Sequence, residues 1–374
     1  MQFPTASASR ASLPVECQGI GLITVMTEQI VDNFKALPSQ APVTRAQRRF
    51  ASIDFLRGTA IVMMLFLHMV SWFLDTDAIF ADINNAPLIN FVALAILPYL
   101  GGLAGFFLLV SSIGNMVSMY KHLQAGKPVG DMIIKQVIGG FLLIVFAYLV
   151  ESTLGYLGAF GDFLRSMDQP LTPARVEGFI TTIGSRGFHF ETIHTIAWCV
   201  LINGVVQGIL SWKGAWRSIK NQVIAYTILA IVVVAITQPI WSLAEGAVAG
   251  GFPWNFSTGH EVPRPNIFDP ATTAIDWLRG VFVYAIAGPM EPLTPYLAVS
   301  FIGSIIGIVI SQPRERIHRH FVRAMMGAGM AMFVIGTTGV VWFVVTVLDG
   351  SGPGYGFEAG VSLYRVISFH RHWF

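Results

Sequence analysis

The chain has 374 residues, of which 54% are hydrophobic and only 12% are charged. This composition is typical of a polytopic membrane protein and excludes a soluble globular domain. A net charge of +2 is too small to indicate a nucleic-acid partner, whereas nine Trp and nine Tyr suit the aromatic belts at the bilayer surfaces. We therefore expect an integral membrane protein in contact with membrane lipids, with no nucleic acid among its partners.

Residues 1–44 are polar, rich in Ser, Ala and Pro, and lack the apolar core of a signal peptide. We expect a largely disordered N-terminal extension there, followed by a membrane domain over residues 45–374. Met26 is an alternative start. An organellar transit peptide is a less favoured interpretation, which rests on Arg10 preceding any acidic residue.

Seven apolar runs are long enough to cross about 30 Å of hydrocarbon. They are residues 55–74, 94–119, 133–154, 191–210, 223–243, 293–311 and 324–348. A further apolar run, residues 278–288, is too short to cross. We therefore predict an all-α fold: a polytopic transmembrane helical bundle of about seven spans plus one re-entrant or interfacial helix. Two long connections, residues 155–190 and 246–276, are expected to be ordered outer loops.

Lys and Arg are concentrated in alternate connections: before the first span and after the second, fourth and sixth spans. By the positive-inside rule, the N-terminus is cytoplasmic and the two long connections face outward. The membrane we expect is the bacterial inner (cytoplasmic) membrane.

The first span carries ionisable residues, which are costly inside a bilayer and usually functional. Ser52 is the predicted N-cap of the helix, and Asp54 is favoured near its positive end. Arg57 and His68 are eleven residues apart, so they share one helical face at a separation of about 16 Å. Gly58 is expected to allow another helix or a ligand to approach the backbone closely. The predicted face consists of Arg57, Ile61, Met64, Leu65 and His68.

The same residues allow a purely structural interpretation. Asp54 and Arg57 can form an ion pair that anchors the helix at the membrane surface, while His68 hydrogen-bonds to a neighbouring helix. The residues alone favour neither interpretation.

The spacing Asp54-x-x-Arg57-Gly58-x-Ala60-x7-His68 resembles the first-helix signature of the membrane acyltransferase superfamily. That superfamily includes enzymes that O-acylate surface polysaccharides and the heparan-alpha-glucosaminide N-acetyltransferase family. Later segments resemble the same superfamily in the same order, so that the resemblance covers about residues 45–310: FFLLVSSIGNMVSM, ETIHTIAWCVLINGV and EPLTPYLAVSFIGSIIG.

The resemblance implies an acyltransferase that moves an acyl group from cytoplasmic acyl-CoA to a carbohydrate or glycoconjugate acceptor on the outward side. Acyl-CoA, with acetyl-CoA as the first choice, is then a co-substrate. Arg57 is implied to bind the acyl-CoA and His68 to transfer the proton as the catalytic residue. These residues suit the roles, because a guanidinium keeps its charge beside phosphate and an imidazole titrates near neutral pH.

The chain departs from the family pattern in two respects. The heparan enzymes carry Asn at the position of His68 and a catalytic His in the next outward loop, whereas residues 74–90 contain no histidine. The family also has ten or eleven spans, against the seven counted here. A smaller bundle is compatible with a short variant, a pseudoenzyme or a chain that a partner completes.

Further polar residues are candidates for acceptor binding. Glu191 and His194 are three residues apart on one helical face and are predicted to line an outward cavity, with helix-end hydrogen bonding as the alternative. Glu151, near the outer end of the third span, is a third candidate, although it can also snorkel to the surface. Glu315 and His318 repeat the E-x-x-H spacing but belong to the opposite membrane face, so we predict no metal site.

Two remaining features are expected to be structural. Glu291, between Pro289 and Pro292, suggests a shaped interfacial loop more than a catalyst. Cys17 and Cys199 form neither a disulfide framework nor a zinc cluster, and Cys199 is expected to pack in an apolar helix.

A second class of function is also consistent with the sequence: a non-catalytic, acyltransferase-like subunit of a larger membrane complex. Residues 327–339 are rich in small residues, which allow helices of other membrane subunits to pack closely.

Overall fold

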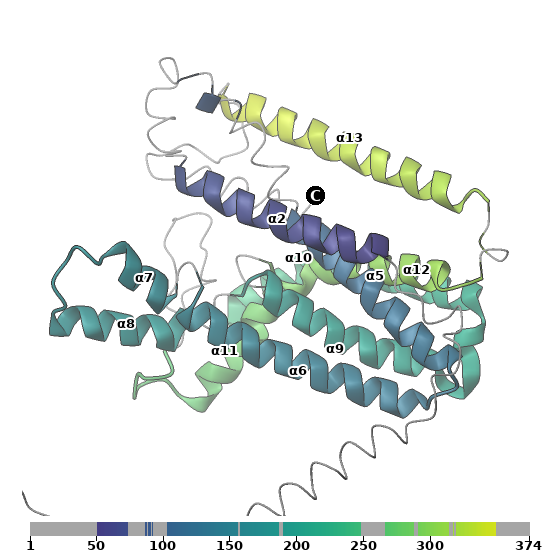
Figure 1. Cartoon of the computed structure of the whole chain (residues 1–374), viewed down its shortest axis with the longest axis horizontal. Helices are drawn as coiled ribbons and strands as arrows, with labels where there is room; N and C mark the ends of the chain where they lie inside the picture. Colours follow the sequence, from purple (N-terminus) through teal and green to yellow (C-terminus); the bar gives the residue numbers. More distant parts are fainter. Residues whose placement is uncertain are drawn as a thin grey trace, which may run out of the picture. The chain divides into compact units, whose positions relative to one another are not determined.

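The structure is a computed structural model of the chain, shown in Figure 1. It describes residues 51–73, 87, 89, 90, 92, 103–155, 158–186, 190–247, 266–287, 291–313, 317 and 319–348. The chain divides into two units, Met1–Arg49 and Phe50–Phe374, and all described residues belong to the second unit. The predictions for the N-terminal extension, for most of the second long connection and for Glu315 and His318 lie outside the described residues.

The described part of the chain consists of helices joined by short connections, and no strand occurs within it. The all-α prediction is therefore confirmed. The elements, labelled as in Figure 1, are α2 (Ala51–Phe73), α5 (Leu103–Gln124), α6 (Val129–Thr153), α7 (Ala159–Arg165), α8 (Pro173–Arg186), α9 (Thr192–Leu210), the 3-10 helix η2 (Trp212–Arg217), α10 (Ile219–Ala247), α11 (Ala274–Ala287), α12 (Leu293–Ile310) and α13 (Phe321–Leu348).

Five of these helices are long and apolar enough to cross a membrane: α6, α9, α10, α12 and α13. This is the pattern of an integral membrane protein. Helices α2 and α5 overlap the first two predicted spans, so the total of seven crossings stays a prediction. Helix α11 has 14 residues, about 21 Å of helix, which is shorter than the hydrocarbon core.

The start of α2 differs from the prediction. The helix already includes Ala51, so Ser52 lies within its first turn and the predicted Ser52 N-cap is wrong. Asp54 does lie in the first turn, where a negative charge is favourable near the helix dipole.

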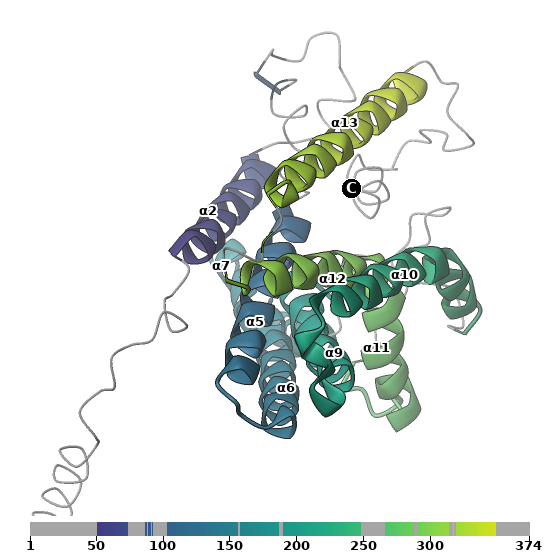
Figure 2. The same cartoon turned by 90° about the vertical axis from the view of Figure 1, so that its right-hand side faces the viewer.

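Helices that are distant in sequence pack against each other in unit Phe50–Phe374. Helix α5 packs against α12, α6 against α9, and α10 against α12, while α9 also contacts α5 and α12. Figure 2 shows α6 and α9 running side by side and α12 lying between α5 and α10. The bundle is therefore held together by contacts between non-neighbouring helices.

Glycines make the contact between α5 and α12 close. A Cβ added to Gly303 would lie 2.8 Å from the carbonyl oxygen of Leu109, and one added to Gly307 would lie 2.7 Å from Cβ of Met116. This Gly-x-x-x-Gly spacing allows membrane helices to approach where no hydrophobic force drives them together.

The contact between α6 and α9 uses the same spacing. A Cβ on Gly204 or Gly208 of α9 would collide with Gln136 and Ile133 of α6, respectively. From the sequence, close packing was predicted for residues 327–339, and neither of these two glycine pairs was predicted.

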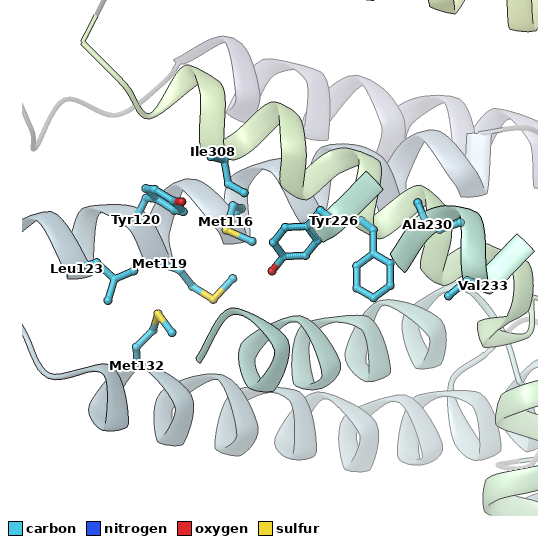
Figure 3. Close-up of a cluster of buried hydrophobic side chains, with 11 residues drawn as sticks. Met116, Met119, Tyr120, Leu123, Met132, Tyr226, Ala230, Val233 and Ile308 are labelled. Atoms are coloured by element: carbon cyan, nitrogen blue, oxygen red, sulfur yellow. The ribbon is translucent and has the colours of Figure 1, made fainter. Parts of the chain in front are cut away.

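The largest apolar core lies between four helices, α5, α6, α10 and α12 (Figure 3). The buried residues of this core are Met116, Met119, Tyr120, Leu123, Met132, Tyr226, Ala230, Val233, Ala298, Phe301 and Ile308.

Cys199 belongs to a second core cluster and is 1% exposed, which confirms its predicted packing role.

A buried hydrogen-bond network joins α5, α9 and α12. The side-chain amide of Asn203 donates to Ser300 Oγ at 2.6 Å, and the hydroxyls of Ser300 and Ser112 are 2.7 Å apart. Ser304 Oγ donates to Asn203 Oδ1 at 3.1 Å. Because these polar groups satisfy one another, they fix the relative positions of the three helices in an apolar setting.

Candidate functional site

Arg57 of α2 lies against the backbone of α5. Its Nη2 is 3.5 Å from the carbonyl oxygen of Ser111, and its Nη1 is 3.9 Å from Asp54 Oδ1. The predicted pairing of Asp54 with Arg57 is therefore present, in a loose and partly exposed geometry. Exposed pairs of this kind contribute about 0–1 kcal/mol to stability, so the pair orients the guanidinium more than it stabilises the fold.

The glycine that accommodates Arg57 is Gly114 of α5. A Cβ added to Gly114 would collide with Nη2 of Arg57 and would lie 2.8 Å from its Cζ. Gly58, in contrast, has no described atom within 4 Å of its Cβ position, so no described helix makes the predicted close approach there, and the approach of a ligand stays a prediction. The contact is made by the long Arg57 side chain reaching a glycine on the neighbouring helix.

Helix α2 is continuous from Ala51 to Phe73, so Arg57 and His68 are joined by an unbroken helix about 16 Å long. The side chain of His68 lies outside the described residues. The buried residues of α2 include Ile53 and Ala60, which are 8% and 0% exposed. The predicted face is thus only partly covered, since Ile61 and Leu65 are 50% and 61% exposed.

At the end of the bundle where α6 stops, three carboxylates come together; we call Glu151, Glu191 and Glu291 the acidic cluster. Glu151 interacts electrostatically with Glu191 and Glu291 and with the guanidinium of Arg186, the last residue of α8. Glu151 and Glu291 are 9% and 5% exposed. The structure therefore brings together residues from four separate segments of the chain.

Glu191 and His194 meet at the start of α9. Glu191 is the N-cap residue, its side chain accepting from the backbone of His194, while the Glu191 N–H donates to His194 Nδ1 at 3.4 Å. Helix-end hydrogen bonding, the alternative considered for this pair, is thus present. Glu191 precedes the helix, so the two residues meet through this capping box and not along a shared helical face.

The ring of His194 is fully buried between two aromatic rings. It lies edge-to-face against Tyr148 at 4.8 Å and beside Phe190 at 5.2 Å. Its neighbour Thr195 donates from Oγ1 to the carbonyl oxygen of Glu291. These contacts connect α9 to the segment that precedes α12 and hold Glu291 beside the other two carboxylates.

The acidic cluster suits the binding of a polyhydroxylated or cationic group. Carboxylates are strong acceptors for hydroxyl donors, and their mutual repulsion favours a ligand that supplies protons or positive charge. Among the residues that the structure describes, no group of three or more His, Cys, Asp or Glu is arranged to hold a metal ion.

Three residues at these sites were not identified as functional from the sequence: Gly114, Arg186 and Glu291. Glu291 carried the clearest signal, because a carboxylate between two prolines in an apolar stretch is unusual. Arg186 and Gly114 carried none, since their neighbours Glu151 and Arg57 are distant in sequence.

Comparison of the chain with protein-family models, with curated proteins and with solved structures finds no match.

Proposed function

We propose that this chain is an integral-membrane acyltransferase that moves an acyl group from acyl-CoA to a carbohydrate or glycoconjugate acceptor. The observation that carries the proposal is Arg57, whose guanidinium lies between Asp54 of α2 and the backbone of α5 at Ser111 and Gly114. A partly exposed guanidinium held against the backbone of a neighbouring helix suits an anionic ligand, and the phosphates of CoA are of that kind.

The resemblance of the α2 motif to the membrane acyltransferase superfamily supplies the reaction. In the proposed step, His68 removes the proton of the acceptor hydroxyl, whose oxygen forms a bond to the thioester carbonyl carbon. The carbon–sulfur bond breaks, and the CoA sulfur leaves with the proton from His68. The length of about 16 Å between Arg57 and His68 is comparable with an extended pantetheine arm.

The acidic cluster is the proposed acceptor site. Glu151 and Glu191 would accept hydrogen bonds from sugar hydroxyls, while His194 holds the first turn of α9 in place. Arg186 moderates the negative charge of the cluster. No metal has a role in this proposal.

The orientation follows from the charge asymmetry of the sequence. We propose a cytoplasmic N-terminus in a bacterial inner membrane, with Arg57 near the cytoplasmic surface and the acidic cluster on the outward side. Donor and acceptor then approach from opposite faces of the membrane.

The role of Arg57 is tested by measuring CoA binding to the purified chain. Arg57→Gln should weaken CoA binding by about tenfold or more, because removing a charged hydrogen-bond partner costs about 1.5–3 kcal/mol. Arg279→Gln is the matched control, since Arg279 is exposed and pairs only loosely with Asp276 at 3.8 Å. Equal CoA affinity in both variants and the wild type would remove Arg57 from the donor site.

One observation favours the second candidate, a non-catalytic subunit of a larger membrane assembly. Nearly all residues of the segment Phe321–Thr338 in α13 lie at the surface of the described structure, whereas 50% of the residues of α9 and 56% of those of α12 are buried. A partner subunit could cover α13. Purification in mild detergent separates the candidates, because a subunit would co-purify with other chains at fixed stoichiometry and tolerate His68→Ala.

A further inference from the structure

The connection between α6 and α9 forms a compact helical hairpin, α7 and α8. Arg175 closes it by donating to the carbonyl oxygens of Ser166 and Pro170 at 2.8 and 2.9 Å. The rings of Phe163 and Phe179 meet at 6.1 Å between the two helices. The hairpin is therefore a defined unit with its own internal contacts.

The hairpin exposes an apolar face to its surroundings. On α8, Val176, Phe179, Ile180 and Ile183 follow the i, i+3, i+4, i+7 spacing of one helical face. Val176 and Ile180 are 41% and 47% exposed. Glu177 and Thr181 lie on the other side of the helix and are also exposed. The exposed apolar side chains of α7 and the turn are Phe160, Phe163, Leu164, Met167 and Leu171.

Along the chain, this apolar face comes directly after the exposed apolar surface of α6. Helix α6 is one of the five candidate spans, and its Leu142, Phe146 and Leu149 are 54–61% exposed, as expected for side chains in contact with lipid. Leu154, at 68% exposure, and Phe160 come next along the chain. Exposed apolar side chains of this candidate span are thus followed, within a few residues along the chain, by those of the hairpin.

We propose that the α7–α8 hairpin lies in the membrane interface, with its apolar face among the lipid acyl chains and its polar face toward water. An amphipathic helix with one apolar and one polar face partitions in this way, whereas 14 residues are too few for α8 to cross. The partner we assign is lipid, because the hairpin follows a candidate membrane span whose exposed side chains are apolar.

The interfacial position has a consequence for the acidic cluster. Helix α8 ends at Arg186, which interacts with Glu151, and the Gly184 carbonyl oxygen accepts from Ile267 N–H at 3.0 Å. The hairpin therefore runs from the lipid-facing surface to the carboxylates, so the cluster lies at the depth of the lipid headgroups. This inference stands whether or not the chain is an acyltransferase.

Spin labels report the depth directly. The full chain, with Cys17→Ser and Cys199→Ser as background, receives a single cysteine at Leu164 or Ile180 on the apolar face, or at Glu177 or Thr181 on the polar face. In nanodiscs of phosphatidylethanolamine and phosphatidylglycerol, labels at 164 and 180 should collide more with oxygen than with a water-soluble nickel chelate. Labels at 177 and 181 should show the reverse.

Two outcomes would overturn the proposal. If labels at 164 and 180 favour the nickel chelate, the hairpin lies in water. If all four labels are shielded from both reagents, protein covers the hairpin instead of lipid. Should a variant fail to fold, Met167→Cys in the same background, labelled with an environment-sensitive fluorophore, provides a second readout that the nine native Trp do not obscure. The label fluorescence should be quenched by lipids brominated near the headgroup end of the acyl chain, and the absence of quenching would count against the proposal.

Discussion

Two glycines illustrate at residue scale how the Arg57 position depends on the neighbouring helix. Gly58 sits beside Arg57 in the sequence, yet no described atom lies within 4 Å of its Cβ position, whereas the Cβ position of Gly114 is filled by the Arg57 guanidinium. Gly58 was predicted as the site of close contact because the sequence shows only which residues are neighbours along the chain. The partner of a seven-atom side chain such as Arg can lie on any helix that the fold brings close.

Gly114→Ala should therefore destabilise the protein and Gly58→Ala should not. The added methyl group at position 114 overpacks the Arg57 contact, at a cost of about 1–3 kcal/mol. At position 58 alanine has free space and gains about 0.5–1 kcal/mol of helix propensity. Unfolding of both variants in mixed detergent micelles measures the difference, and equal stabilities would show that Arg57 is not held against Gly114.

At the scale of elements, apolar run length predicted the long helices but not α7 and α8, which lie in the connection 155–190 that was predicted to be an ordered loop. Predicted spans at residues 133–154 and 293–311 correspond to α6 at Val129–Thr153 and α12 at Leu293–Ile310. The polar start of α9 was placed one residue early, because the Glu191 capping box lies just outside the helix. Run length cannot tell which helices pair, since pairing depends on glycine faces that the hydropathy pattern does not distinguish.

The glycine contact between α5 and α12 gives a second prediction. Gly307→Val should prevent close packing, because the Cβ position already lies 2.7 Å from Met116 Cβ and 2.9 Å from the Ile113 carbonyl oxygen. Gly139→Val on α6 is the matched control, with no described atom within 4 Å of its Cβ position. Size-exclusion chromatography in detergent should show aggregation or loss of the monodisperse peak for Gly307→Val alone. A normal profile for Gly307→Val would argue against the α5–α12 contact.

For the whole molecule, the sequence indicated a helical membrane protein from composition alone, and the five apolar helices agree. The acidic cluster was predicted in part. Glu151, Glu191 and His194 were chosen for their expected positions near one membrane face, but Glu291, about 100 residues further on, was assigned to a structural loop. The packing of α9 against the segment before α12, through Thr195, places Glu291 with the other two carboxylates.

The proposed orientation can be tested by cysteine labelling in intact cells. Asn255→Cys, in the second long connection, should react with an impermeant maleimide added outside. Arg217→Cys, at the end of η2, should react only after permeabilisation, because the positive-inside rule assigns its positively charged connection to the cytoplasmic side. The reverse pattern would invert the orientation and place the acidic cluster in the cytoplasm.

The most direct test of the acyltransferase proposal is transfer of label by the purified chain. Proteoliposomes containing a trapped glycoconjugate extract are incubated with radiolabelled acetyl-CoA, using the wild type and His68→Ala at equal amounts of folded, monodisperse protein. The wild type should move label into the trapped glycan fraction and release CoA thiol, and His68→Ala should lose about 10²–10⁴-fold of this rate, as expected for a proton-transfer residue. Unchanged turnover in His68→Ala, or no transfer by the wild type alone, would contradict the proposed enzyme.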